Sequence, residues 1–314
     1  MTDQRTRARS FGAVAAQYHR ARTGYDTADL AWALHLPDRP DPPDGRAGSG
    51  LRVLDVAAGT GRITLTALQL GAAVGGIDAV EPDPGMRAEF TRRVSPRSPV
   101  TLHDGTAEAV PLPDGSVDAV VVGSAYHWFD PQPAAAELAR VLRPGGTLAA
   151  LWTGPDEQLG WVRSYREAAR ALLEDGEVQR DGTRAADPRN PEPGTAELAD
   201  ADPADADLEN PEPVNPNPAD PAAGDDRHRD IPASPYFEPT ERREFLHIET
   251  FQRSELVAAV GTYSALLVAD PARRDAALAA VADAVAAVIP DDVVASDGAV
   301  RLPVRVRGAR CVRR

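Results

Sequence analysis

The stretch that decides the fold of this chain is Val53-Leu-Asp-Val-Ala-Ala-Gly-Thr-Gly61. Its apolar, β-branched start leads into Asp55 and then into a turn of small residues, a pattern that predicts a buried parallel strand with its carboxyl end at a ligand. Gly59 and Gly61 let a bound molecule approach the main chain closely. Residues 62–70 then have the apolar spacing of a helix that begins at once.

Two kinds of ligand fit such a turn. A dinucleotide site has the fingerprint G-x-G-x-x-G, in which the third glycine lets the helix pack closely and the helix N-terminus takes the pyrophosphate. Here the third position is Thr64. A nucleoside that carries an amino-acid tail needs no pyrophosphate site, and an acid at the strand end followed by a glycine turn suits it. The turn alone does not separate the two ligands.

A second apolar strand, residues 77–81, ends in Glu81, and Pro82 to Met86 turn the chain into the next helix. A carboxylate at the end of the second strand of a doubly wound sheet is placed to accept both ribose hydroxyls of a nucleoside. Dehydrogenases use the same device, and a solvated loop acid is the alternative interpretation. Glu81 therefore indicates a nucleoside ligand, but it does not distinguish a dinucleotide from a nucleoside with an amino-acid tail.

The blocks that follow carry a resemblance. Residues 100–103 and 119–122 read as strands around a loop at 104–118, and residues 142–152 turn into a fifth strand. In this order they resemble the class I S-adenosylmethionine-dependent methyltransferase family, whose motifs are D-x-G-x-G-x-G, G-D-A-E-x-L-P-F-x-D-x-S-F-D and L-(K/R)-P-G-G-x-L. Ala57 replaces the first glycine of the first motif, and Thr106 replaces an adenine-contacting aspartate of the second.

The resemblance is strongest to type-11-like methyltransferases whose fourth strand ends in a His-Trp-Phe run, here residues 127–129. Upstream, residues 18–25 are similar to the family's Y-x-x-x-R-P-x-Y segment, with Thr23 in place of the proline. In relatives this segment folds over the cofactor. Tyr18 offers aromatic area that excludes water, and Arg22 offers a guanidinium that can grip a carboxylate. An amphipathic helix with its aromatic residue on the protein body and its arginine in solvent is the alternative.

The resemblance implies a doubly wound, Rossmann-like α/β fold. Its seven-stranded sheet is mostly parallel with one antiparallel strand, and helices cover both faces. It implies S-adenosylmethionine as the cofactor and no metal. The residues that it implies for cofactor binding are Tyr18, Arg22, Asp55, Ala57, Gly59, Gly61, Glu81, Pro82, Met86, Thr106, Ala107, Glu108 and Ser124.

Methyl transfer is an in-line displacement in which positioning supplies much of the rate, so a catalytic base is optional. His127 is the first choice for a general base because imidazole titrates near neutral pH and lies just beyond a strand's carboxyl end. A packed wall residue is the equally weighted alternative. Asp130 is interpreted as the cap of the next helix.

Composition narrows the class of protein. The chain has one cysteine, which excludes a disulfide framework and a Cys-based metal site within it, and its 34 basic residues are all arginine, which excludes lysine chemistry. The first residues carry no apolar segment of a signal peptide, and no uncharged run approaches membrane-spanning length. We expect a cytoplasmic monomer or homodimer that acts on a small-molecule acceptor, without a membrane or nucleic-acid partner.

The formal charge of −14 is unevenly distributed. Residues 181–230 hold 14 acidic residues against four arginines, together with nine prolines and no aromatic residue. Such a segment cannot bury enough surface to offset its ordering entropy. We therefore divide the chain into a methyltransferase core with its covering segment (1–180), a disordered acidic insertion (181–232) and the rest of the same domain (233–314). An acidic tether for a basic partner is the less favoured interpretation of the insertion.

The C-terminal part reads as folded. Residues 243–251 alternate like a strand, a helix begins after the cap Ser254, residues 271–289 form a helix with an apolar stripe, and 300–306 form the last strand. Trp161 and Tyr165 lie on another helix as candidate acceptor-side residues, although core packing is the stronger interpretation.

The sequence thus predicts a methyltransferase with S-adenosylmethionine as its donor and a small molecule as its acceptor. Two alternatives stay open: an NAD-dependent oxidoreductase, and a non-catalytic protein that senses the cofactor on the same fold.

Overall fold

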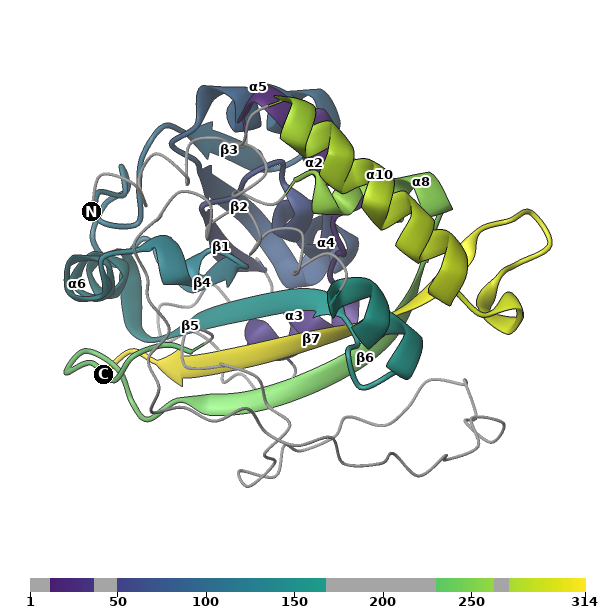
Figure 1. Ribbon diagram of the computed structural model, residues 1–314. Helices are drawn as coiled ribbons and strands as arrows, with labels where there is room; N and C mark the ends of the chain where they lie inside the picture. Colours follow the sequence, from purple (N-terminus) through teal and green to yellow (C-terminus); the bar gives the residue numbers. More distant parts are fainter. Residues whose placement is uncertain (1–11, 37–49, 168–229, 263–270) are drawn as a thin grey trace, which may run out of the picture.

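The computed structural model describes residues 12–36, 50–167, 230–262 and 271–314 (Figure 1). The expected acidic insertion lies outside the described residues except for 230–232, where Ile231 is already buried in the core. The domain boundaries proposed above therefore stay predictions, although the folded chain has resumed by Ile231.

The elements in chain order are η1 (Gly12–Val14), α2 (Ala15–Ala21), α3 (Thr27–Ala33), β1 (Leu51–Val56), α4 (Arg62–Gln69), η2 (Gly71–Ala73), β2 (Val74–Val80), α5 (Pro84–Arg93), β3 (Val100–His103), β4 (Val117–Gly123), η3 (Tyr126–Trp128), α6 (Pro131–Val141), β5 (Leu142–Pro155), β6 (Glu241–Phe251), α8 (Arg253–Val260), α10 (Pro271–Val288), η5 (Asp291–Val293) and β7 (Val300–Val312). The chain is also helical over 160–167.

The strands form one seven-stranded sheet in the order β3-β2-β1-β4-β5-β7-β6. All the pairs from β3 to β5 are parallel, and β7 runs antiparallel to both of its neighbours. Six strands therefore end at the same edge of the sheet. The strand order reverses between β1 and β4, and such a switch point is where open α/β sheets bind their ligands. The predicted fold, with its single antiparallel strand, is confirmed.

Both faces of the sheet are covered, which explains the unbroken apolar strands (Figure 1). Along β4, Ala119 and Val121 join the core under α3, α4, α8 and α10, whereas Val120 and Val122 join the core under α6. Because successive side chains point to opposite faces, a strand segment with two covered faces is apolar at successive positions, as 119–122 are.

The C-terminal elements agree with the sequence in kind and differ in their ends. Helix α8 begins after Gln252 and not after Ser254, and the Glu255 side chain there accepts a hydrogen bond from the Gln252 N–H at 2.8 Å. Within α10 the stripe is confirmed, with Val281 and Val285 fully buried. Strand β7 has 13 residues and runs to Val312, whereas the predicted strand ended at residue 306. None of the helices in the described ranges is long and apolar enough to cross a membrane.

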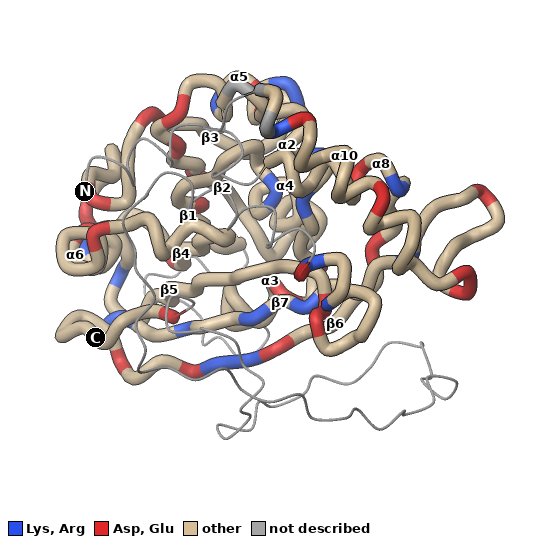
Figure 2. Tube along the Cα trace, viewed as in Figure 1, with Lys and Arg blue, Asp and Glu red and all other residues tan. Residues whose placement is uncertain are grey.

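Figure 2 shows arginines and acidic residues interspersed along β6 and β7. The printed pairs join neighbouring strands: Arg305 and Arg307 of β7 each contact Glu244 of β6, and Arg310 contacts Glu241. These pairs are partly buried cross-strand contacts that align the two antiparallel strands.

Candidate functional site

The turn after β1 combines two left-handed glycines with a left-handed alanine. Ala57 has φ 54°, Gly59 φ 57° and Gly61 φ 87°. A Cβ atom built on Gly59 would meet nothing nearer than the Ala57 carbonyl oxygen at 4.0 Å, so the main chain here faces open space. A Cβ on Gly61 would lie 2.9 Å from the Phe90 ring of α5. Gly61 therefore serves helix packing, whereas Gly59 leaves room beside the backbone.

Asp55 is 1% exposed at the end of β1, and its two oxygens are used differently. Oδ2 accepts hydrogen bonds from the Thr64 backbone N–H at 3.1 Å and the Thr64 hydroxyl at 2.7 Å. Oδ1 is buried and has no partner among the described residues. Burial raises the pKa of Asp55 to about 7. Thr64, which takes the place of a third glycine, therefore holds this carboxylate at the start of α4.

Glu81, just past β2, is 6% exposed and is oriented by two backbone donors. Its Oε2 accepts from the Gly59 N–H at 2.8 Å, and its Oε1 accepts from the Asp83 N–H at 2.8 Å. Burial raises the pKa of Glu81, and these two hydrogen bonds oppose that shift. The carboxylate thereby links the glycine turn to the corner that Pro82 makes before α5. Met86 is buried in the first turn of α5, where its N–H is capped by Asp83.

Residues 12–26, named here the covering segment, cross the ends of three neighbouring strands. At its start, Gly12 lies against Gly85 of α5, where an added Cβ would come within 2.7 Å of the Gly12 backbone. In its middle, the His19 ring nitrogen Nδ1 lies 2.8 Å from the Thr60 hydroxyl of the glycine turn. At its end, the Tyr25 hydroxyl lies 3.0 Å from Ser124 Oγ, just past β4.

Arg62, the first residue of α4, holds the covering segment from below. Its guanidinium donates to the backbone carbonyls of His19 and Arg22 at the end of α2. Positive charge suits a helix C-terminus, because the last carbonyls point there. Burial and the Arg62 charge lower the pKa of His19 to about 4, so this imidazole is neutral at physiological pH.

Tyr18 and Arg22 lie on the covering segment as predicted, and the Arg22 guanidinium stacks 5.2 Å from the centre of the Tyr18 ring. Arg22 also donates from Nε to the Thr262 hydroxyl at 3.0 Å and from Nη2 to the Thr262 carbonyl at 3.2 Å. These bonds tie the segment to the end of α8. A role for Tyr18 and Arg22 in cofactor binding stays a prediction.

A cavity of about 350 Å³ lies beside the covering segment, between α4 and the end of β6. Glu249 of β6 closes one side, where it accepts a hydrogen bond from the Gly24 N–H at 2.5 Å and lies 3.2 Å from His247 Nε2. Glu249 and Asp29 raise the pKa of His247 against the opposing effect of burial. Glu249 and Arg62, two charged residues that line this cavity, thus bind the covering segment to β6 and α4.

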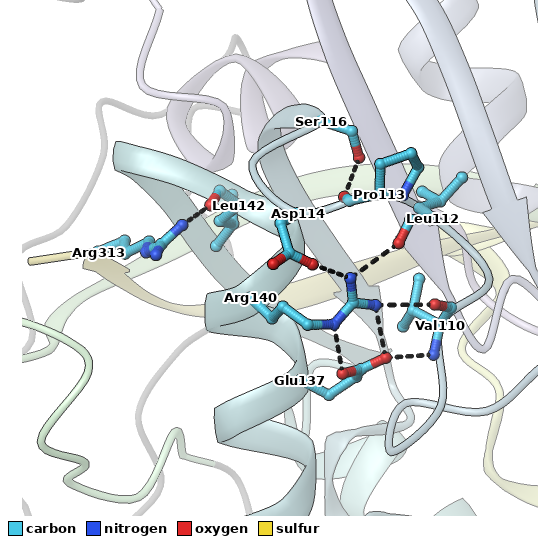
Figure 3. A network of polar contacts seen from close by, with 9 residues as sticks. All are labelled: Val110, Leu112, Pro113, Asp114, Ser116, Glu137, Arg140, Leu142 and Arg313. Carbon is cyan, nitrogen blue, oxygen red and sulfur yellow. Dashed lines mark hydrogen bonds and ion pairs between the residues drawn. The ribbon is translucent and has the colours of Figure 1, made fainter.

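The loop between β3 and β4 is anchored by an ion pair on α6 (Figure 3). Arg140 donates to the carbonyls of Leu112 at 2.9 Å and Val110 at 3.0 Å and to Asp114 at 2.6 Å, and it pairs with Glu137. Glu137 in turn accepts from the Val110 N–H at 2.8 Å. Arg140 lowers the pKa of Glu137. The loop is thereby held in one shape although it has no regular structure.

The three loop residues predicted for adenine binding lie at the start of this loop. Thr106 and Ala109 exchange backbone hydrogen bonds, Ala107 is 3% exposed, and Glu108 accepts a hydrogen bond from the Asp130 N–H at 3.0 Å. Ala107 packs in the same core as Val80 of β2, the strand that precedes Glu81. The backbone of this segment is therefore close to the end of β2, and its contact with a cofactor stays a prediction.

The segment after β4 is not extended. Residues 126–128 form a 3-10 helix, in which Tyr126 is buried in the core, Trp128 is half-buried and His127 is exposed. The His127 and Trp128 rings lie 4.8 Å apart. Asp130 occupies the N-cap position of α6, but its side chain makes no capping hydrogen bond. The role of His127 as a base stays a prediction.

Tyr165 lies in the core, where its hydroxyl donates to the Leu256 carbonyl at 2.9 Å, and Trp161 packs against the same core. Five residues with contacts in this region were not predicted as site residues: His19, Tyr25, Arg62, Arg140 and Glu249. The signal for Tyr25 was present, because it ends the family motif in the covering segment. The other four act through contacts between elements far apart in the chain, for which one sequence holds no signal.

Comparison with known proteins agrees with this architecture. Residues 54–150 match the family model described as "Methyltransferase domain". An uncharacterized methyltransferase of Mycobacterium tuberculosis is 40% identical over 179 residues, which cover 57% of this chain and 65% of that protein. An uncharacterized methyltransferase of Schizosaccharomyces pombe is 31% identical over 168 residues, covering 53% and 59%. The chain thus spans less than two thirds of the length of these relatives.

Among solved structures, a protein from Anaeromyxobacter dehalogenans whose description assigns it to the type II methyltransferases is similar over 93% of this chain and 97% of its own. It is 21% identical, with a TM-score of 0.48.

The strand order defines the class of fold: an α/β domain whose sheet reverses its order between β1 and β4, which is the place where open α/β sheets bind their ligands. Over residues 54–150 the chain is thus similar to methyltransferase domains.

The left-handed conformation of Ala57 makes a prediction about stability. A non-glycine residue in this conformation costs about 1–2 kcal/mol, which exceeds the entropic cost of about 0.5–1 kcal/mol that glycine adds. Ala57→Gly should therefore raise the free energy of unfolding by up to about 1 kcal/mol. Its neighbour Ala58 has no positive φ and is buried, so Ala58→Gly should lower it. Urea unfolding midpoints measure both, and equal losses for the two variants would contradict the strained turn.

Proposed function

We propose that this protein binds S-adenosylmethionine across the ends of β1, β2 and β4 and transfers its methyl group to a small-molecule acceptor. One observation carries the proposal: the covering segment crosses the ends of these strands directly over a glycine turn whose Gly59 faces open space. A roofed strand edge with acids on two neighbouring strands suits a nucleoside with a charged tail.

The residues present fit the proposed cofactor. Its α-ammonium group supplies the positive charge and donors that the buried, unpartnered Asp55 Oδ1 lacks. Each Glu81 oxygen accepts one backbone hydrogen bond and keeps a lone pair for a ribose hydroxyl. Gly59 gives the space for close approach to the main chain. Pro82, Met86 and residues 106–108 are proposed to form the adenine end of the site.

When bound, the cofactor supplies an electrophilic methyl group on a sulfonium. The chain's own contribution is to hold that group in line with the acceptor, since positioning at near-attack distance accounts for much of the rate. Tyr18 and the rest of the covering segment exclude water above the turn. Asp55 holds the amino-acid tail of the cofactor, and Glu81 holds its ribose. Whether oxygen, nitrogen, carbon or sulfur accepts the methyl depends on the pocket shape and is not assigned by the fold.

The alternative of an NAD-dependent oxidoreductase is less well supported. A dinucleotide turn uses its third glycine for close packing, and here Thr64 fills that position and is committed to Asp55 by two hydrogen bonds. A non-catalytic sensor of the same cofactor differs from an enzyme only in having no acceptor, so turnover separates these two.

Calorimetry on the full chain tests the donor. S-adenosylmethionine and S-adenosylhomocysteine should each give saturable heat, and NAD should give none. Heat with NAD alone would establish the oxidoreductase alternative and remove the proposal. Incubation with a methyl-labelled donor and small-molecule extracts should then label a product in the low-molecular-weight fraction. Binding without any labelled product favours the sensor.

The raised pKa of Asp55 predicts a pH dependence of binding. In the free protein the carboxyl is largely protonated below pH about 7, whereas the cofactor's ammonium group favours the ionised form. Affinity for S-adenosylhomocysteine should therefore rise between pH 6 and 7.5, by up to about tenfold per pH unit below the pKa. Asp55→Asn should flatten this slope, and Asp275→Asn, at an exposed position of α10, should keep it. A slope unchanged in Asp55→Asn would contradict the assignment.

A base role for His127 makes a separate prediction. Once an acceptor is known, His127→Ala should lower kcat by about 10²–10⁴-fold while the affinity for S-adenosylhomocysteine stays the same. His103→Ala, at the end of β3, is the matched histidine control for kcat. Unchanged turnover in His127→Ala would make His127 a wall residue.

A further inference from the structure

Ser124 ends β4 in a way that removes its carbonyl from the sheet. Parallel pairing of Gly123 with Leu151 is continued by the Ser124 N–H, which donates to the Leu151 carbonyl at 2.7 Å. The next bond of a regular parallel ladder would run from the Thr153 N–H to the Ser124 carbonyl. Instead, the Thr153 N–H points to the Ser124 hydroxyl oxygen at 3.4 Å.

The cause is the backbone of Ser124, which has φ 51°. A left-handed residue at a strand end turns its carbonyl out of the ladder, and for a non-glycine residue this conformation is strained and needs support from its surroundings. Within the part of the chain that the structure describes, no N–H donates to the Ser124 carbonyl. The serine side chain thus replaces its own main chain in the sheet and frees the carbonyl at the switch point.

Tyr25 supplies the support. Its ring enters from the covering segment, and its hydroxyl lies 3.0 Å from Ser124 Oγ and 3.5 Å from the Leu151 carbonyl. Gly123 makes the space, because a Cβ there would lie 3.0 Å from the Tyr25 oxygen. Burial raises the pKa of Tyr25, so the hydroxyl keeps its proton. The Tyr25 hydroxyl therefore orients the Ser124 hydroxyl, which accepts the hydrogen bond from the Thr153 N–H.

We propose that Tyr25 is a positioning residue that holds the Ser124 hydroxyl in the sheet and so keeps the Ser124 carbonyl available to the α-ammonium group of the cofactor's amino-acid tail. The inference rests on the proposed function, which places the cofactor at this edge. Placement of the covering segment is thereby coupled to the shape of the tail site, because Tyr25 both anchors the segment and positions Ser124 at the end of β4.

The structure offers a matched control. Tyr165 is also a buried tyrosine, and its hydroxyl donates a hydrogen bond of 2.9 Å to a backbone carbonyl, that of Leu256 in α8. Tyr25→Phe and Tyr165→Phe each remove one buried hydroxyl from an otherwise unchanged ring. Only the first removes a contact with Ser124.

The test measures two ligands by calorimetry on the full chain: S-adenosylhomocysteine, and 5′-methylthioadenosine, which has the nucleoside and the sulfur but no amino-acid tail. Tyr25→Phe should weaken S-adenosylhomocysteine about tenfold, the effect of about one lost hydrogen bond, and leave 5′-methylthioadenosine within twofold. Tyr165→Phe should change neither affinity. Thermal unfolding of all variants verifies that they are folded.

Ser124→Gly provides a second variant, since glycine adopts the left-handed backbone without strain but has no hydroxyl. It should weaken S-adenosylhomocysteine selectively, and adding Tyr25→Phe to it should cost nothing more, because the two residues act as one unit. Equal affinity of Tyr25→Phe and wild type for S-adenosylhomocysteine, or equal weakening of both ligands, overturns the positioning role while leaving the proposed function intact. Wild-type protein that binds neither ligand overturns both.

Discussion

The site depends on the burial of one carboxylate. Asp55 ends β1 almost without exposure, and a buried carboxylate needs hydrogen-bond donors close by. Thr64 gives two, and it can do so only because α4 begins immediately after the glycine turn. The same start of α4 places Arg62 beneath the end of α2, where it holds the covering segment. Hydrogen bonds therefore connect Asp55, the glycine turn, the start of α4 and the covering segment.

Left-handed backbone marks the places where this arrangement leaves regular structure. Ala57 and Ser124 follow β1 and β4, the two strands on either side of the switch point, and both are non-glycine residues with positive φ. Strain of this kind persists only where surrounding contacts enforce it, and it is common at ligand sites. The two positions lie side by side at the edge, since Val56 pairs with Val122. Both therefore shape the same stretch of strand edge.

Much of the fold could be predicted from the sequence, because most of its strands and turns have short-range sequence patterns. The apolar strands, the glycine turn and the Pro-Gly-Gly turn before the antiparallel region each have a short-range cause, and their order implied the sheet. Helix ends were less predictable: α8 begins after Gln252, whose N–H donates to the Glu255 side chain, although Ser254 is the better cap by residue type. The 3-10 helix at 126–128 was not predicted, because a single short turn has no periodic pattern in the sequence.

The site was predictable only in part for the same reason. Asp55, Gly59 and Glu81 lie at strand ends, so their convergence follows from parallel topology. The contacts of Gly24 with Glu249, Arg22 with Thr262 and Arg140 with Leu112 join residues that the sequence places far apart, and they depend on how complete elements pack. Gly61 is an example at a single residue. Its place in the glycine motif predicted a contact with the ligand, whereas in the structure the space beside its Cα is filled by the Phe90 ring.

The most direct test of this account is a crystal structure of the full chain with S-adenosylhomocysteine. The account predicts electron density for the ligand beneath residues 12–26, with its ribose hydroxyls on Glu81 and its α-amino group between Asp55 and the Ser124 carbonyl. Density for the ligand elsewhere on the protein, or with its ribose away from Glu81, would contradict it.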